Sequence, residues 1–144
     1  MKRFLLPVDG SPSSQHAAIV LIERMLTGSE KIELHLLNVQ LPMNYDLETN
    51  LSGLSVDNPQ QERGERELSS VRALLDKAGL PYACHIVAGN PVQTIIDFAQ
   101  ANHMDRIVIG SRNLSPRVGE LMSAVARNVA KGTSLPVEVI PLHI

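Results

Sequence analysis

The chain has 144 residues and a formal net charge of −2 at pH 7, a length that suits one domain and a charge that offers no basic stripe for nucleic acid. It contains two Phe, two Tyr and no Trp, which leaves few side chains on which bases could stack. No apolar run reaches the ~20 residues of a membrane helix, the first apolar stretch is too short for a secretory signal, and Cys84 is the single cysteine, so we expect a cytoplasmic protein with neither nucleic acid nor a membrane as a partner.

The first part of the chain predicts a strand, a turn, a helix and a second strand. Residues 4–8 are an apolar run followed by polar turn residues, which is typical of a buried strand. Ser11 can cap a helix and Pro12 suits its first position. The apolar stripe of that helix ends near Gly28, and residues 32–39 are again apolar and predict the second strand.

The middle of the chain predicts a long loop, a helix, a strand and another helix. Residues 40–59 are rich in Pro, Asn, Ser and Gly and favour a mobile surface loop. Residues 60–78 have apolar positions at helical spacing. Residues 82–88 predict a third strand, and Asn90 is placed to cap a helix over residues 92–99.

The last part predicts a strand, a glycine loop, a helix and a final strand. The apolar residues 106–109 are followed by GSRNLSPRVGELMSA, residues 110–124, which has the place of a phosphate-binding loop between a strand and a helix. The helix is expected over residues 119–131. Residues 136–140 predict the final strand, closed by Pro141.

Strands that alternate with helices predict an α/β fold. We expect a three-layer α/β/α domain over residues 1–144, with a five-stranded parallel sheet between two helical layers. Right-handed crossovers place helices on both faces only if the chain reverses its direction of travel within the sheet. Ligands bind outside the carboxyl ends of the strands at that reversal, so residues that follow the strands, such as Asp9 and Gly110, are candidate ligand contacts.

Short segments in order along the chain match a known family. They are Pro7-Val8-Asp9-Gly10-Ser11, Leu36-Leu37-Asn38-Val39, Gly89-Asn90-Pro91 and Ile107-Val108-Ile109-Gly110-Ser111-Arg112, with Pro136-Val137 opening the last strand. With this spacing, the chain resembles the universal stress protein family over nearly its whole length. The resemblance implies an adenine nucleotide alpha hydrolase-like sheet of order 3-2-1-4-5, a homodimer through the last strand from Val137 to Ile140, and a regulatory or protective role in stress without catalysis.

The resemblance also implies a nucleotide site. In the nucleotide-binding branch of the family, ATP or AMP with Mg²⁺ lies in the crevice under a motif of G-x-x-G, nine residues, then G-S or G-T. Gly110 matches the first glycine, whereas Asn113, Ser123 and Ala124 replace the three later positions. The family site implies that Asp9 lies near the adenosine and that the backbone of Val39 holds the base. The expected binding residues are Pro7, Val8, Asp9, Val39, Ile109, Gly110, Ser111, Arg112, Asn113, Ser123, Ala124 and Val125.

The three replacements predict a weakened phosphate site. Asn tolerates a left-handed turn better than most residues, so Asn113 should preserve the turn at small cost. Ser123 adds a β-carbon where phosphate oxygens would approach, and Ala124 removes a hydroxyl donor. Together the changes should cost roughly 3–5 kcal/mol, or about two to four decades of affinity.

Three functions stay open from the sequence. The first is a binding protein whose affinity for ATP is weak or lost. The second retains an adenine nucleotide, with Arg112, Arg117 and Arg127 replacing the missing phosphate contacts. The third is a small flavin or redox domain of similar topology, which the scarcity of aromatic residues disfavours. In each case we expect no catalytic residue.

Four further features have structural interpretations. His35 and His85 should lie on neighbouring strands, but the pattern offers no nearby carboxylate, so we expect structural histidines and no metal site. Cys84 is expected to be a small buried side chain rather than a reactive thiol. Asp9 has the alternative role of a turn former that caps the first helix, and the charged residues 62–67 should form a solvated helix face.

Overall fold

The computed structural model describes residues 1–42, 59–113 and 124–143, which form five strands and four helices in alternating order. The strands are β1 (Lys2–Pro7), β2 (Ile32–Gln40), β3 (Ala83–Ala88), β4 (Arg106–Asn113) and β5 (Val137–His143). The helices are α1 (Pro12–Thr27), α3 (Pro59–Ala78), α4 (Pro91–Ala101) and α6 (Ala124–Gly132).

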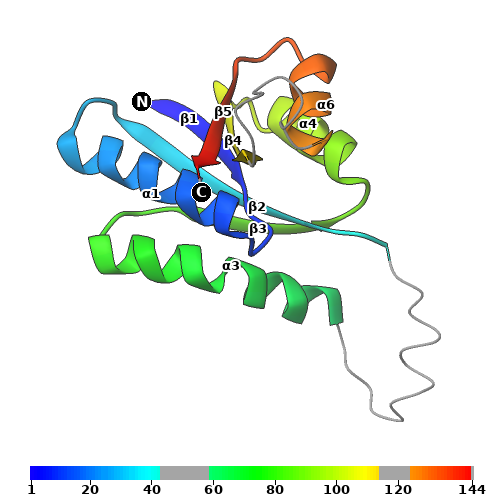
Figure 1. The fold of residues 1–144 in the computed structure, drawn as a ribbon, viewed down its shortest axis with the longest axis horizontal. Coiled ribbons are helices and arrows are strands. Elements are labelled where there is room, and N and C mark those ends of the chain that lie inside the picture. The colour runs from blue at the N-terminus through cyan, green and yellow to red at the C-terminus, as the bar shows by residue number, and fades with distance from the viewer. Residues whose placement is uncertain (43–58, 114–123, 144) are drawn as a thin grey trace.

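The five strands form one parallel sheet of order β3-β2-β1-β4-β5, which confirms the predicted order. Figure 1 shows α1 and α3 on one face of the sheet and α4 and α6 on the other. The chain leaves β1 toward β2 on one side and later returns beside β1 as β4. The reversal of direction therefore lies between β1 and β4, where parallel α/β proteins place their ligands.

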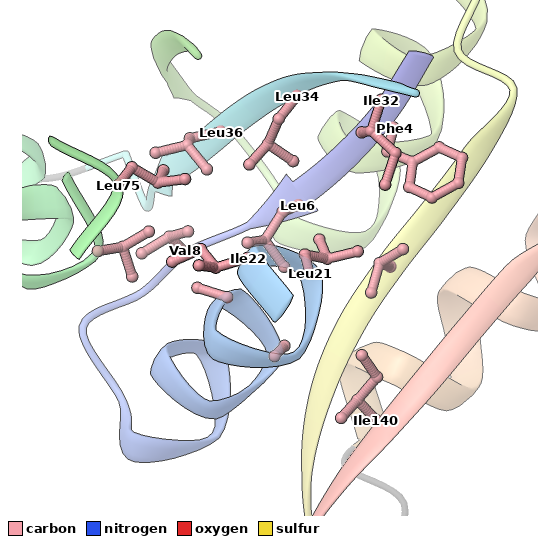
Figure 2. Close-up of a cluster of buried hydrophobic side chains, with 14 of the residues drawn as sticks. Phe4, Leu6, Val8, Leu21, Ile22, Ile32, Leu34, Leu36, Leu75 and Ile140 are labelled. Atoms are coloured by element: carbon pink, nitrogen blue, oxygen red, sulfur yellow. The ribbon is translucent and has the colours of Figure 1, made fainter. Parts of the chain in front are cut away.

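Two apolar clusters, one on each face, hold the layers together. On the α1 and α3 face, Leu6, Leu21 and Leu34 are fully buried within a cluster of apolar side chains, most of which Figure 2 shows. On the α4 and α6 face, Leu5 and Leu37 pack against buried side chains of both helices. Burying a leucine side chain contributes about 1.5–3 kcal/mol, so these apolar strand residues determine which helix faces turn inward.

The predicted helix caps are confirmed. Ser11 precedes α1, and its Oγ accepts a hydrogen bond from the backbone N–H of Ser14 at 3.3 Å. Gly28 ends α1 with φ of 71°, a left-handed conformation that glycine adopts without strain. Asn90 precedes α4 in the same way, since its Oδ1 accepts from the N–H of Gln93 at 3.2 Å. These caps fix where α1 and α4 begin relative to the ends of β1 and β3.

An ion-pair cluster ties α1 to β5. Arg24 of α1 donates through both Nη atoms to the carboxylate of Glu138, with Nη1 lying 2.8 Å from Oε1. Arg106 of β4 donates to the same Oε1 over 3.3 Å. Glu138 is 29% exposed, and its hydrogen bond with Arg24 holds the pKa of this carboxyl below its usual range. The cluster therefore favours the ionised carboxylate and a fixed position of α1 against β5.

The two last strands are longer than the sequence predicts. The predicted fourth strand ends at Ile109, but β4 continues to Asn113, which pairs with His143. The predicted loop at Gly110 is wrong for its first four residues, because β5 extends past Pro141 and offers them a ladder partner. A proline is tolerated there because β5 is the edge of the sheet.

Two other predicted segments fall partly outside the described residues. Of the predicted loop 40–59, Gln40 is the last residue of β2 and Pro59 the first of α3, while residues 43–58 are not described. Of the predicted helix 119–131, the structure describes α6 from Ala124 onward.

Candidate functional site

A cavity of about 440 Å³ opens where β1, β2 and β4 end, at the reversal of the sheet. Its walls come from strand ends and from the first turns of α1, α4 and α6. The lining residues are Pro7, Val8, Asp9, Ser11, Ser13, Ser14, Leu37, Val39, Pro91, Ile95, Ile109, Gly110, Arg112 and Val125. Six different elements thus converge on one space, because parallel strands end at the same edge of the sheet.

Most of the site residues predicted from the sequence line this cavity. Those that do are Pro7, Val8, Asp9, Val39, Ile109, Gly110, Arg112 and Val125. Ser111 is 3% exposed and is not part of the lining, because successive strand residues point to opposite faces. Ala124 begins α6 as an exposed residue outside the lining. Ser123 and Arg117 lie outside the described residues.

Asn113 does not form the turn that the sequence predicts. Its backbone belongs to β4 and pairs with His143, and Asn113 is not among the residues with positive φ. The left-handed conformation that the glycine motif suggested at this position is therefore wrong. The ladder with β5 imposes extended backbone here, which needs no glycine.

Gly110 has a packing role that the sequence did not reveal. A Cβ placed on Gly110 would lie 2.2 Å from the carbonyl oxygen of Ser13 and 3.1 Å from the nitrogen of Ser14. The first turn of α1 thus rests directly on the backbone of β4, and a side chain here would push the two apart. Glycine is required at this position for the close approach, independently of any ligand.

Asp9 forms the turn considered from the sequence and also lines the cavity. Its Oδ1 accepts a hydrogen bond from the backbone N–H of Ser11 at 3.0 Å, so it shapes the turn between β1 and α1. It is also exposed and lines the cavity. The turn uses only Oδ1, so Oδ2 can accept a hydrogen bond from a ligand hydroxyl.

Three serines at the start of α1 line the cavity, namely Ser11, which the sequence indicated as a cap, and Ser13 and Ser14. Ser13 and Ser14 are 7% and 5% exposed. The hydroxyls of Ser11 and Ser13 lie 3.1 Å apart, and Ser14 donates its hydroxyl to the carbonyl of Ser11 over 3.0 Å. These contacts hold the serines in place as a polar wall beside Asp9.

Only part of the apolar wall opposite the serines was predicted from the sequence. Leu37 and Val39 are two residues apart on β2 and share a face, so strand alternation could have assigned Leu37 once Val39 was chosen. Pro91 and Ile95 lie one helical turn apart on α4, and their position at the cavity depends on how α4 packs. Aliphatic walls of this kind suit a flat, largely apolar ring.

A buried polar network behind the cavity fixes the end of β1. Asn38 is fully buried and donates from Nδ2 to the carbonyl of Val8 at 2.8 Å and to Oε1 of Glu67 at 3.0 Å. Gln40 donates to the same carboxylate at 2.9 Å and to Oδ1 of Asn38 at 2.7 Å. Glu67 of α3 is therefore not simply part of a solvated face, since its carboxylate satisfies two buried amides.

The histidine and cysteine expectations also need correction. His35 and His85 do lie together, with Nδ1 and Nε2 3.1 Å apart, but a carboxylate is present as well: Oε2 of Glu33 lies 2.7 Å from Nε2 of His35. Cys84, expected to be buried, is exposed on the edge strand β3. Partial desolvation raises the pKa of its thiol, so it is not an activated nucleophile.

Within residues 1–42, 59–113 and 124–143, no helix is long and apolar enough to cross a membrane. The same residues contain no group of three or more His, Cys, Asp or Glu side chains placed to hold a metal ion.

Comparison with known proteins gives matches over nearly the whole chain. The model of the universal stress protein family matches residues 1–141. Universal stress protein MJ0531 of Methanocaldococcus jannaschii is 25% identical over 140 residues, covering 96% of this chain and 81% of that protein. Universal stress protein MJ0577 of the same organism is 26% identical over 152 residues, covering 96% of this chain and 94% of that protein.

Solved structures have the same fold. The structure of MJ0577 superposes with a TM-score of 0.73 at 21% identity, covering 99% of this chain and 97% of that one. A universal stress protein family protein of Arabidopsis thaliana, solved with AMP bound, superposes with a TM-score of 0.72 at 18% identity, covering 99% and 93%.

Proposed function

The chain belongs to the universal stress protein family, and we propose that its cavity binds the adenosine part of an adenine nucleotide while holding a triphosphate tail weakly. The protein then acts by binding rather than by turnover, as a cytoplasmic homodimer with a regulatory or protective role in stress. The observation that supports this most is the cavity of about 440 Å³ at the sheet reversal. A fold relative from Arabidopsis thaliana was solved with AMP bound.

The adenosine end of the cavity has suitable chemistry. Val39 and Ile95 supply aliphatic surface on two sides, and Asp9 stands at the polar end with a carboxylate that can accept from ribose hydroxyls. A volume of about 440 Å³ lies within the ~300–1,000 Å³ typical of small-molecule sites. Aliphatic walls with a few converging polar groups are the usual composition of such sites.

The phosphate end of the cavity offers fewer suitable contacts than the adenosine end. Ala124 has no hydroxyl to donate, and Asn113 is held in the β4 ladder rather than in an anion-binding turn. Arg112 is exposed and is the one arginine among the described residues that line the cavity, so its guanidinium can bind a single phosphate group. One such contact suits a monophosphate, whereas a chain of three phosphates with Mg²⁺ needs more donors.

Non-catalytic action fits the residues at the cavity. Its described lining contains Asp9 and Arg112 as charged groups and no His, Cys or Lys. The serine hydroxyls bond to one another and to backbone rather than to a base, so none of them is activated as a nucleophile.

Titration calorimetry with adenosine, AMP and ATP, the last with and without Mg²⁺, tests the ligand. We expect the dissociation constants of AMP and ATP to agree within about tenfold, because the triphosphate adds few contacts. If ATP bound more than 100-fold more tightly than AMP, the proposed weak binding of the triphosphate would be contradicted. Failure of all three ligands to bind at millimolar concentration would contradict nucleotide binding altogether.

A matched pair of variants tests whether the ligand binds in the cavity. Val39 lines it, whereas Val87, its register partner on β3, packs in the same apolar cluster without lining it. Val39→Phe should fill the cavity and weaken AMP binding at least tenfold, and Val87→Phe should leave it unchanged. Equal effects of the two variants would mean that the nucleotide binds elsewhere.

Ala124→Ser, alone or with Ser123→Gly, tests the phosphate end. A restored hydrogen bond to a charged group contributes about 1.5–3 kcal/mol, which corresponds to roughly 10-fold to 150-fold in ATP affinity. Adenosine binding should not change. A gain for adenosine as well would show that the substitution reshapes the cavity instead of adding a phosphate contact.

The homodimer is proposed through β5, since this strand is paired on one side by β4 and forms an edge of the sheet. Unpaired edge strands are templates for a second copy. Native mass spectrometry should find twice the chain mass of 15.7 kDa, and hydrogen exchange of β5 amides should slow as concentration rises. A monomer at all concentrations would refute the dimer.

A further inference from the structure

A histidine pair lies outside the cavity, on the face of the sheet that α4 covers. His35 of β2 and His85 of β3 present Nδ1 and Nε2 to each other at 3.1 Å. Their rings are nearly parallel, with an interplanar angle of 11°. The ring of His85 also packs against Phe98 of α4, with centroids 4.7 Å apart.

A carboxylate selects the tautomer of His35. Oε2 of Glu33 lies 2.7 Å from Nε2 of His35 and 2.8 Å from Nε of Arg3. A carboxylate that pairs with a guanidinium is ionised and can only accept, so His35 must donate its proton from Nε2. In the neutral imidazole, Nδ1 then keeps a lone pair that faces His85, and His85 supplies the hydrogen between the two rings.

We propose that His35 and His85 together bind one late first-row divalent cation, with Zn²⁺ as the reference ion. Two nitrogens bound to tetrahedral Zn²⁺ at about 2.0–2.1 Å lie roughly 3.3 Å apart, and the two ring nitrogens are already 3.1 Å apart. The separation of the two nitrogens therefore fits one ion. The ring centroids are 5.4 Å apart, so the lone pairs now lie along the line between the nitrogens, and each ring has to turn by roughly 35° for both to meet at a tetrahedral ion. His85 changes tautomer as this happens: its proton moves from Nε2 to Nδ1, and the ring stays neutral.

Glu33 would be the outer partner of a carboxylate–histidine–metal arrangement. In such sites the ligand imidazole donates its second N–H to a carboxylate, which fixes the tautomer and raises the basicity of the bound nitrogen. Here the carboxylate is in place before any metal binds. Imidazole nitrogen selects Zn²⁺, Ni²⁺ or Cu²⁺ over Mg²⁺ and Ca²⁺, which require oxygen ligands.

The remaining coordination positions fall to water. Among the described residues no third His, Cys, Asp or Glu joins the pair around one point. The side chain of His35 is 12% exposed, and His85 is half-buried on the edge strand β3, so the pair is reachable from solvent. A two-imidazole site of this kind exchanges its metal instead of holding it permanently, and it does not depend on the nucleotide proposal.

Zn²⁺ titration against a chromophoric chelator at pH 7.5 tests the site, in a Cys84→Ser background because the exposed thiol would compete. We expect one saturable ion per chain. His85→Gln should abolish this binding, whereas His16→Gln, on the opposite face in α1, should not change it. Glu33→Gln should keep the stoichiometry and weaken binding about 10-fold to 100-fold. No saturable binding, or equal binding by His85→Gln, would overturn the proposal.

NMR of the ring nitrogens tests the same site in the Cys84→Ser protein, which keeps both histidines, so its result does not depend on whether the histidine variants fold. Zn²⁺ should shift the Nδ1 resonance of His35 and the Nε2 resonance of His85, and leave those of His16 unchanged. In the metal-free protein, Nε2 of His35 should be protonated. Zn²⁺-induced shifts confined to other histidines would show that the metal binds away from this pair.

Discussion

Gly110→Ala separates a packing requirement from a ligand requirement. The new Cβ would lie 2.2 Å from the carbonyl oxygen of Ser13, whereas carbon–oxygen contacts are normally about 3.3–3.6 Å. The first turn of α1 would have to retreat from β4 by about 1 Å. It is not free to do so, because Ala18 and Leu21 of α1 are fully buried against the sheet.

Overpacking of this kind typically costs about 1–3 kcal/mol and more where backbone is the obstacle, so we expect Gly110→Ala to lower the free energy of unfolding by about 3 kcal/mol. This is a large share of the ~5–15 kcal/mol that stabilises a typical domain. The variant should remain folded in dilute buffer but unfold at a urea concentration roughly 1–3 M lower.

Urea unfolding followed by circular dichroism is the assay, and Gly132→Ala is the control. A Cβ on Gly132 would lie 2.6 Å from Cδ1 of Ile96, the movable end of a side chain, so its cost should stay below about 1 kcal/mol. Equal urea midpoints for the two variants would refute the close packing of α1 on β4. Gly110 would then be needed for ligand approach alone.

Three other substitutions test the contacts that hold the layers. Glu138→Gln should cost about 1.5 kcal/mol by weakening its charged hydrogen bonds with Arg24. The pKa of Glu138 is lowered in the folded protein, so this stabilisation is complete above the unfolded pKa of about 4.3 and is lost as pH falls through the folded pKa. The urea midpoints of the wild type and the variant should therefore converge in acid. A constant difference between the midpoints down to pH 2 would contradict this expectation. Asn38→Leu should cost about 2–3 kcal/mol, because the carbonyl of Val8 loses a buried donor, and a neutral effect on thermal unfolding would mean that water replaces the amide. Asn90→Ala should cost about 1 kcal/mol as a lost N-cap, whereas Asn90→Ser should retain most of the stability.

The candidate site could be predicted from the sequence where it is built by strand ends. Asp9, Val39 and Gly110 each follow or close an apolar run, and the carboxyl ends of parallel strands meet at one edge. That rule alone brings these residues to one cavity. The phosphate motif was less reliable, because Asn113 was assigned to a turn from glycine spacing and instead pairs with β5.

The site could not be predicted where helices supply it. Ser13 and Ile95 occupy first turns whose caps the sequence indicates clearly, but whether a helix turn reaches the cavity depends on its packing against the sheet. The same limit applies to Glu33, which is two residues from His35 on the same strand face and completes the polar chain to His85. Strand alternation could have found Glu33, but only the register of β2 with β3 brings His85 within reach.

The order of strands and helices could be predicted from the sequence, because apolar periodicity, caps and turn residues are local properties of the chain. The edge of the sheet at which ligands are expected follows from that order. The lengths of β4 and β5, the contact of α1 with Gly110 and the carboxylate beside His35 are set by packing between elements. These features depend on contacts between residues far apart in sequence, and the free energy of those contacts overrides local preference.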